Sequence, residues 1–312
     1  MNLISIRGLE RREIEKVLSL AEDMENSIEF DRFARESKQM ENKKSSKKYD
    51  GKILATLFFE PSTRTRLSFQ TAALRLGMQS VDLSPEISSL KKGESFIDTI
   101  KVVSGYADVL VVRHPNEGAS MLAADSSQKP VINAGDGSNQ HPTQTMIDLY
   151  TIKKNKGKFA GLKVFLVGDL KHARTMHSLV YALAMFGADI TLVSPPNLEM
   201  DAELIDEIEE KFKASIKTTG ELEFKNADVI YVCRIQEERF VDPYEVKRVK
   251  EQFTIKAEHL RNASPNVIIL HPLPKLNEID SSLEDSKNVK CFEQAHYGVP
   301  VRMAILDYVL SK

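Results

Sequence analysis

Residues 53–77, ILATLFFEPSTRTRLSFQTAALRLG, decide the fold class of this chain. The apolar run at 53–59 predicts a buried strand. From Pro61 onward, apolar side chains recur at helical spacing until Gly77, a residue type that commonly ends helices. The stretch is therefore a strand followed directly by a helix, which is the repeating unit of parallel α/β sheets.

The same alternation continues along most of the chain. Further strands are predicted at 80–83, 109–113, 131–134, 163–167, 188–193, 229–233 and 267–270. Helices are predicted around 14–21 and at 95–106, 118–124, 143–154, 174–186, 201–212 and 301–310. A Lys- and Gly-containing segment at 155–161 separates two such series, and the charged, Ser-rich segment 36–48 is predicted to be a solvated loop. The predicted fold class is α/β, with two open parallel-sheet domains and helices on both faces.

Length and charge restrict the function classes. The chain has 312 residues and a formal net charge of −2, from 43 Lys and Arg against 45 Asp and Glu. A single hydrophobic core stops growing near about 250–300 residues, which favours two domains. A near-neutral chain lacks the overall positive field of nucleic-acid-binding proteins. Any anion site must therefore depend on a local cluster of basic residues.

Metal, membrane and nucleotide sites are not expected. Cys233 and Cys291 are the only cysteines and form no C-x-x-C pair, and the seven His residues show no metal-ligand spacing. No apolar run is long enough to span a membrane, and the N-terminus lacks a signal-peptide core, so the expected location is cytoplasmic. The loop at 168–174 has one Gly where a dinucleotide site needs several, and no P-loop motif occurs, so no cofactor is expected.

Ligands of open α/β sheets bind beyond the carboxyl ends of the strands, so functional side chains are expected in the loops there. The first loop contains Ser62, Thr63, Arg64 and Thr65 at the start of a helix. Free amide N–H groups, the helix dipole, hydroxyls and guanidinium groups all favour a phosphate there. A helix-capping Ser with solvent-facing arginines is the alternative, but two arginines and three hydroxyls within 62–66 favour an anion site.

Other strand ends also carry polar residues. Arg113 ends one strand, whereas His141 and Gln144 begin a helix at a spacing that lets both face one ligand. His141 taken alone is better explained as a capping or core histidine. The loop containing Ser88 and Lys92 fits a solvated turn or a binding loop equally well.

The second series of strands offers groups that suit carboxylates. Arg174 begins a helix, and Arg234 and Gln236 lie on one side of an extended segment. The prolines of the motif at 271–274, HPLP, leave carbonyl oxygens free to accept hydrogen bonds from an amide. Without a Ser–His–Asp set or paired catalytic carboxylates, the predicted site is electrostatic: it would position a phosphate compound against an acid and stabilise developing negative charge.

Together, these motifs resemble the aspartate/ornithine carbamoyltransferase family. The matching stretches are FEPSTRTR at 59–66, KKGE at 91–94, RHP at 113–115, HPTQ at 141–144 and HPLP at 271–274. The Lys-rich loop, RIQ at 234–236 and HPLP are similar to the aspartate branch. The resemblance covers nearly the whole chain, in a single order of motifs, and implies the carbamoyltransferase fold.

The resemblance implies condensation of carbamoyl phosphate with L-aspartate to N-carbamoyl-L-aspartate and phosphate, an early step of pyrimidine synthesis. It implies a carbamoyl phosphate-binding domain at 1–142, joined by a C-terminal helix at 298–312, and an aspartate-binding domain at 143–297. It also implies roles for the residues at the strand ends. Carbamoyl phosphate would be bound by Ser62, Thr63, Arg64, Thr65, Arg113, His141, Gln144, Pro272 and Leu273, among which Arg64, Thr65, Arg113 and His141 would be catalytic. Aspartate would be bound by Lys92, Arg174, Arg234 and Gln236.

The resemblance further implies a homotrimer in which Ser88 and Lys92 reach a neighbouring subunit's site. Many relatives also associate with a separate regulatory chain, so the sequence leaves a regulatory partner and allosteric control open. His172 and Ala173 depart from the Tyr-Gly that is usual before the family's Arg, and Lys275 and Asn277 stand where Arg and Asp are common. These departures bear on affinity for aspartate more than on the type of reaction.

Two other functions remain as alternatives. A carbamoyltransferase acting on ornithine would need an acidic or neutral pocket for a cationic side chain, and Arg234 and Gln236 argue against it. A non-catalytic phosphate-ligand sensor or structural subunit could use the same fold. Every expected motif position is filled, which favours the enzyme.

Overall fold

The computed structural model describes residues 1–36, 48–85, 88–236 and 243–311. The solvated loop predicted at 36–48 lies outside the described residues except at its ends. The chain forms two compact units, the first comprising Met1–Tyr150 and His296–Lys312, and the second Thr151–Ala295.

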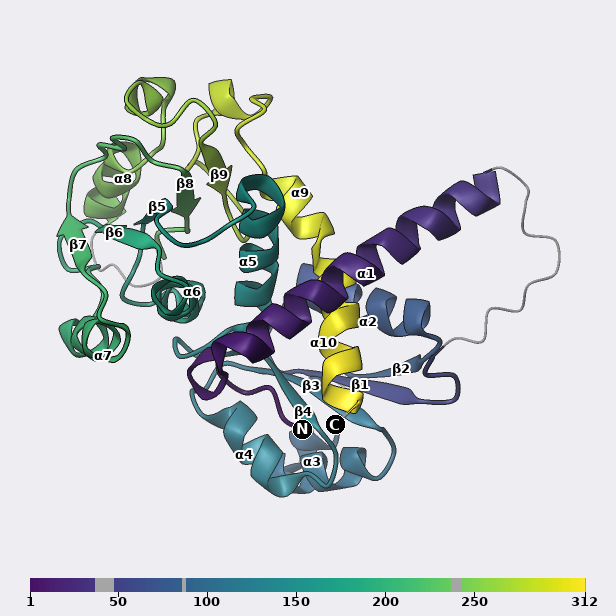
Figure 1. The fold of residues 1–312 in the computed structure, drawn as a ribbon. Coiled ribbons are helices and arrows are strands. Elements are labelled where there is room, and N and C mark those ends of the chain that lie inside the picture. The colour runs from purple at the N-terminus through teal and green to yellow at the C-terminus, as the bar shows by residue number, and fades with distance from the viewer. Residues whose placement is uncertain (37–47, 86–87, 237–242, 312) are drawn as a thin grey trace. The chain divides into compact units, whose positions relative to one another are not determined.

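The first unit is built on a parallel sheet with the strand order β2-β1-β3-β4. Its strands are β1 (Ile53–Phe58), β2 (Gln79–Leu83), β3 (Val109–His114) and β4 (Val131–Asp136). Its helices are α1 (Arg11–Glu36), α2 (Thr63–Leu76), α3 (Phe96–Ser104), α4 (Ala119–Ser126) and α10 (Gly298–Leu310), and α5 (Pro142–Lys156) continues into the second unit. Helices α3 and α4 cover one face of the sheet, whereas α2 and α10 cover the other (Figure 1).

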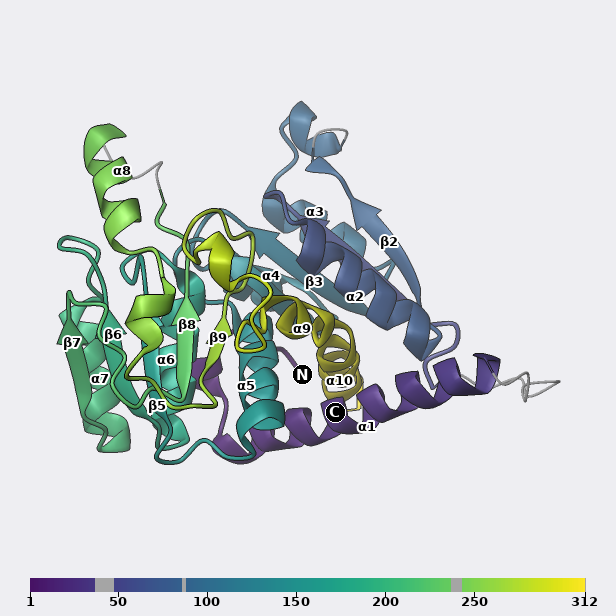
Figure 2. The same cartoon turned by 90° about the horizontal axis from the view of Figure 1, so that it is seen from above.

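The C-terminal helix belongs to the first unit although most of the chain separates the two in sequence. Helix α10 packs against α1 and α2, and both views show it beside them (Figures 1 and 2). Nearly all of α10 is buried, including Arg302 and Asp307. Charged residues are rarely buried without partners, so this helix carries polar contacts as well as core packing.

The second unit contains a parallel sheet with the order β7-β6-β5-β8-β9. Its strands are β5 (Lys163–Val167), β6 (Asp189–Val193), β7 (Ile216–Thr219), β8 (Val229–Val232) and β9 (Ile268–Leu270). Its helices are α6 (Arg174–Met185), α7 (Ala202–Phe212), α8 (Pro243–Gln252) and α9 (Cys291–His296). Short 3-10 helices occur at Ile6–Gly8, Ser89–Lys92, Ala257–Leu260 and Ser281–Leu283.

The α/β class and both parallel sheets predicted from the sequence are confirmed. Gly77 ends α2 as expected, in the left-handed conformation with φ of 90°. The sequence reading did not identify β7, α8 or α9. Strand β7 is a partly exposed edge strand and α8 is rich in charged residues, so neither shows a clear apolar pattern.

Candidate active site

The turn between β1 and α2 has the geometry of an anion site. Ser62 occupies the N-cap position in an extended conformation, but its side chain makes no capping hydrogen bond. Thr65 is buried, and desolvation lowers the pKa of Arg64. The first turn therefore presents backbone N–H groups, hydroxyls and a guanidinium group without the Ser62 hydroxyl being used as a cap.

Arg113 links the carboxyl ends of three neighbouring strands. Its Nη2 lies 2.5 Å from Oε1 of Glu60, which follows β1. Its Nη1 donates to the carbonyl oxygen of Ala134 on β4 at 3.2 Å, and lies 3.5 Å from Nε2 of His141. The structure therefore brings Arg113 and His141 together beside the turn that contains Ser62–Thr65.

His141 begins a helix and also lies beside Arg113. Its carbonyl oxygen accepts hydrogen bonds from the backbone N–H groups of Gln144 and Thr145, so it begins α5. Its ring is buried and lies next to Arg113 on one side, while Nδ1 is 3.4 Å from the hydroxyl of Thr143. A helix-starting histidine can therefore also face a ligand.

Gln144 has a polar partner that the sequence reading missed. Its Nε2 donates a 2.8 Å hydrogen bond to Oδ1 of Asp148, which is fully buried. Glu60 and Arg302 were also missed. The i, i+4 spacing of Gln144 and Asp148 on a helix could have predicted their hydrogen bond. Nothing in the sequence pairs Arg302 with this region.

The loop after the edge strand β2 holds Ser88 and Lys92. The Ser88 hydroxyl donates to the carbonyl oxygen of Pro85 at 3.0 Å, and Lys92 is exposed at the end of a short 3-10 helix. A single chain leaves their predicted role in a neighbouring subunit as a prediction.

In the second unit, the loop after β5 is tightly packed. Gly168 has φ of +124°, and a Cβ there would lie 2.4 Å from the carbonyl oxygen of Cys233, so this position requires glycine. Asp169 is fully buried and accepts from the backbone N–H of His172, with the His172 ring nitrogen Nδ1 at 3.0 Å. These contacts shape the loop that leads to Arg174.

The predicted carboxylate-binding residues lie at neighbouring strand ends of this sheet. Arg174 is the first residue of α6 and is half-buried. Arg234 and Gln236 follow β8, which pairs directly with β5. The parallel register therefore places Arg174, Arg234 and Gln236 at the same edge of one sheet.

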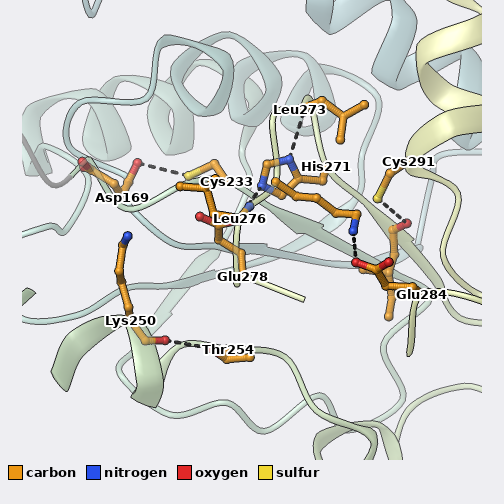
Figure 3. Close-up of polar contacts among 12 residues, drawn as sticks. Asp169, Cys233, Lys250, Thr254, His271, Leu273, Leu276, Glu278, Glu284 and Cys291 are labelled. Carbon is orange, nitrogen blue, oxygen red and sulfur yellow. Dashed lines mark hydrogen bonds and ion pairs between the residues drawn. The ribbon is translucent and has the colours of Figure 1, made fainter. Parts of the chain in front are cut away.

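The segment after β9 is held by a buried histidine (Figure 3). Nδ1 of His271 accepts a 2.9 Å hydrogen bond from the backbone N–H of Leu273, whose φ is 59°. On the other side of the ring, Nε2 lies 3.6 Å from Oε2 of Glu278, which accepts from the N–H of Leu276. Both ionisable side chains are nearly inaccessible to solvent. They fix the backbone at Pro272 and Leu273, where carbonyl oxygens were predicted to bind an amide.

Neither cysteine has the environment of a reactive thiol. Burial raises the pKa of Cys291 to about 11 and that of Cys233 well above its usual value. Among the described residues, His, Cys, Asp and Glu side chains form no group of three that could hold a metal ion. Across those same residues, the helices lack the length and apolar character that crossing a bilayer requires.

Comparison with known proteins identifies the family. The carbamoyl-P binding domain model of aspartate/ornithine carbamoyltransferases matches residues 1–154, and the Asp/Orn binding domain model matches residues 160–309. The aspartate carbamoyltransferase catalytic subunit of Methanosphaera stadtmanae is 48% identical, with 99% of this chain and 98% of the relative covered.

Solved structures agree with that match. The catalytic subunit of M. jannaschii aspartate transcarbamoylase has a TM-score of 0.89 and 46% identity, covering 99% of this chain and 98% of its own. The Trypanosoma cruzi aspartate transcarbamoylase in complex with carbamoyl aspartate and phosphate has a TM-score of 0.90 and 33% identity, covering 99% and 95%. This chain belongs to the aspartate/ornithine carbamoyltransferase family.

Proposed function

We propose that this member of the family transfers the carbamoyl group of carbamoyl phosphate to the amino group of L-aspartate. The products are N-carbamoyl-L-aspartate and phosphate, and the reaction is an early step of pyrimidine synthesis. The contact of Arg113 with His141, beside the Ser62–Thr65 turn, is the observation that carries this function. Relatives named for this activity match nearly the full length, and the T. cruzi enzyme has been solved with carbamoyl aspartate and phosphate.

The first unit would bind carbamoyl phosphate. The backbone and side chains of Ser62, Thr63, Arg64 and Thr65 would hold the phosphate, together with Arg113. Thr65, Arg113 and His141 would polarise the carbamoyl carbonyl. Negative charge develops on that oxygen when an amine attacks the carbon, and preorganised donors stabilise it most strongly at that moment. The buried positions of Thr65 and His141 favour this role because they limit competition from water.

The carbamoyl NH2 group would be recognised by acceptors. Gln144 in the first unit offers an amide, and Pro272 and Leu273 in the second offer backbone carbonyl oxygens. His271 supports the backbone of Pro272 and Leu273 by accepting a hydrogen bond from the N–H of Leu273. Each of these groups would recognise the nitrogen that distinguishes a carbamoyl group from an acetyl group.

L-Aspartate would be bound by cationic and amide side chains of the second unit. Arg174 would bind the α-carboxylate, whereas Arg234 and Gln236 would bind the side-chain carboxylate, with Lys92 contributed from a neighbouring subunit. A guanidinium group is suited to this because it donates two parallel hydrogen bonds to a carboxylate. An ornithine side chain carries a positive charge, which Arg234 would repel.

The reaction needs no cofactor. The amino nitrogen attacks the carbamoyl carbon, the bond from that carbon to the bridging phosphate oxygen breaks, and phosphate leaves. The attacking amine must lose a proton, for which the departing phosphate is a suitable acceptor. Carbamoyl phosphate would bind before aspartate, and a conformational change would then complete the aspartate site.

The proposed assembly is a homotrimer. Ser88 and Lys92 lie in an exposed loop next to the edge strand β2, and the neighbouring side chains of Val81, Val102 and Tyr106 are exposed apolar groups. If Lys92 completes a neighbouring site, mixing Lys92→Ala with Arg64→Ala chains will restore part of the activity that each variant lacks. Mixed assemblies that stay as inactive as the separate variants would contradict the shared site.

A cytoplasmic location and association with a regulatory chain are part of the same proposal. The relatives' names describe catalytic subunits, which supports a larger assembly. Sizing by light scattering, for the purified chain and for the protein in native extract, distinguishes a trimer of this chain from a complex with a second chain.

A colorimetric assay for ureido products tests the proposed activity. Purified protein is incubated with carbamoyl phosphate and, separately, L-aspartate, L-ornithine and other amines. Among these amines, only L-aspartate is expected to be carbamoylated. Preference for L-ornithine would identify the other branch of the family. If none of the amines is carbamoylated, a non-catalytic binding protein is favoured.

A further inference from the structure

The side-chain amide of Gln144 has a defined orientation. Its Nε2 donates to Oδ1 of Asp148, one helical turn further along α5, at 2.8 Å. A carboxylate oxygen accepts hydrogen bonds and cannot donate them, so the nitrogen end of the amide must face Asp148. The oxygen end, Oε1, is consequently directed away from Asp148.

Asp148 has its own electrostatic support in the core. It is fully buried, and a buried carboxylate requires a compensating charge. Arg302 on α10 is 3% exposed and lies 5.0 Å from the ring centroid of Phe69. Burial, with the nearby positive charges of Arg113 and Arg64, lowers the pKa of Arg302 to about 9, and the negative charge of Asp148 opposes that shift. Arg302 also lies near the start of α5, because a Cβ at Gly298 would meet both Nη1 of Arg302 and the side chain of Ile147, the residue before Asp148.

The position of Arg302 depends on a glycine. A Cβ at Gly298, the first residue of α10, would lie 2.7 Å from Nη1 of Arg302. The Nε of Arg302 has no hydrogen-bond partner among the described residues. A buried guanidinium with an unsatisfied nitrogen destabilises the fold, so its presence calls for a role other than packing.

We propose that the buried Asp148 is a positioning residue that makes Gln144 present its amide oxygen to the NH2 group of carbamoyl phosphate. The proposal rests on the proposed function, in which Gln144 binds that group. An amide oxygen accepts a hydrogen bond from NH2 but makes none with a methyl group. Asp148 therefore determines the preference for carbamoyl phosphate over acetyl phosphate, which differs only by a methyl group in place of NH2.

The substitution Asp148→Asn tests this orientation. An asparagine at position 148 can donate from its NH2 group, as Asp148 cannot, and that group can take the oxygen of Gln144 as its acceptor. Gln144 would turn its nitrogen toward the substrate NH2, leaving two donors facing each other. We expect kcat/KM for carbamoyl phosphate to fall about 10- to 100-fold, whereas the inhibition constant of acetyl phosphate changes by less than about threefold.

Controls separate positioning from a general structural effect. The matched variant Asp125→Asn changes an exposed aspartate of α4 and should leave both constants unchanged. In a Gln144→Ala background, Asp148→Asn should lower kcat/KM for carbamoyl phosphate by less than about threefold, because the residue through which Asp148 acts is gone. Should Asp148→Asn fail to fold, the pair Asp148→Leu with Arg302→Met removes both buried charges together and still deprives Gln144 of its acceptor.

Each outcome decides the proposal. An equal loss for carbamoyl phosphate and acetyl phosphate, or no loss for either, would overturn it. Full additivity with Gln144→Ala would also overturn it, because Asp148 would then act independently of Gln144. Failure of the proposed function is seen separately, since the wild-type protein would show no turnover of carbamoyl phosphate with L-aspartate.

Discussion

The two units use buried charge in different ways. In the first, two carboxylates contact proposed substrate-binding residues directly: Glu60 pairs with Arg113, and the buried Asp148 accepts from Gln144. In the second, the buried pair His271 and Glu278 holds main-chain N–H groups instead. Substitutions at Glu60 or Asp148 should therefore alter chemistry, whereas those at the buried pair of the second unit should alter backbone geometry and stability.

The largest effect is expected at Arg64. Arg64→Ala should reduce kcat about 100- to 1000-fold, because a preorganised donor to the phosphate is lost. The control Arg66→Ala removes a guanidinium from the same helical turn, one that pairs with Asp82 at 3.3 Å, and should change kcat little. Steady-state kinetics with both substrates decide the matter, and near-normal turnover by Arg64→Ala would remove the basis for the phosphate site.

A smaller and more selective loss is expected at Arg234. Arg234→Ala should lower kcat/KM for L-aspartate about 10- to 100-fold, because a charge-assisted bond to the carboxylate is lost. The KM for carbamoyl phosphate should stay unchanged. Arg261→Ala, an exposed arginine of the same unit, is the control. Equal losses for L-aspartate and for amines without a side-chain carboxylate would contradict the assignment.

Stability rather than chemistry should respond at Glu278. Glu278→Ala leaves the His271 ring and the N–H of Leu276 without their buried partner, which should lower the free energy of unfolding by about 2–3 kcal/mol. Glu284→Ala breaks a pair with Lys275 in which the carboxylate is half exposed, and it should cost less than about 1 kcal/mol. Urea denaturation compares them. Equal stability of the two variants would show that the buried pair is not needed to hold this segment.

The smallest effect concerns pH. Burial lowers the pKa of His114, partly opposed by Glu60 and Asp136. The unfolded chain then binds the proton more readily, so His114 contributes full stability above about pH 6.5 and loses it as the pH falls from there through the lower folded pKa. His114→Phe should flatten the melting-temperature profile between about pH 5 and 7. A profile as steep as that of the wild-type protein would assign the dependence to other groups.

The sequence was most informative where a local pattern defines both the element and the site. The apolar run of β1 and the helical spacing after Pro61 place Ser62–Thr65 at a helix start, and the structure has them there. The parallel sheet then accounts for the proximity of Arg113 and His141, because Arg113 lies near the end of β3 and His141 follows its neighbour β4.

Contacts between distant parts of the chain could not be predicted. Arg302 reaches the first unit only because the C-terminal helix returns to pack against α1 and α2, and no periodicity in α10 shows which helix it will contact. The pairing of His271 with Glu278 depends on a turn at Leu273 with positive φ, which is uncommon for leucine. Tertiary packing determines both arrangements.

The proposal that the first unit binds carbamoyl phosphate and the second binds aspartate is tested most directly by carbamoyl phosphate binding without any amine. Calorimetric titration of the wild-type protein, Arg64→Ala and Arg234→Ala measures the dissociation constant of the first substrate alone. We expect the dissociation constant to rise at least about 10-fold for Arg64→Ala and to stay unchanged for Arg234→Ala. A loss in Arg234→Ala as large as that in Arg64→Ala, or no loss in Arg64→Ala, would contradict it.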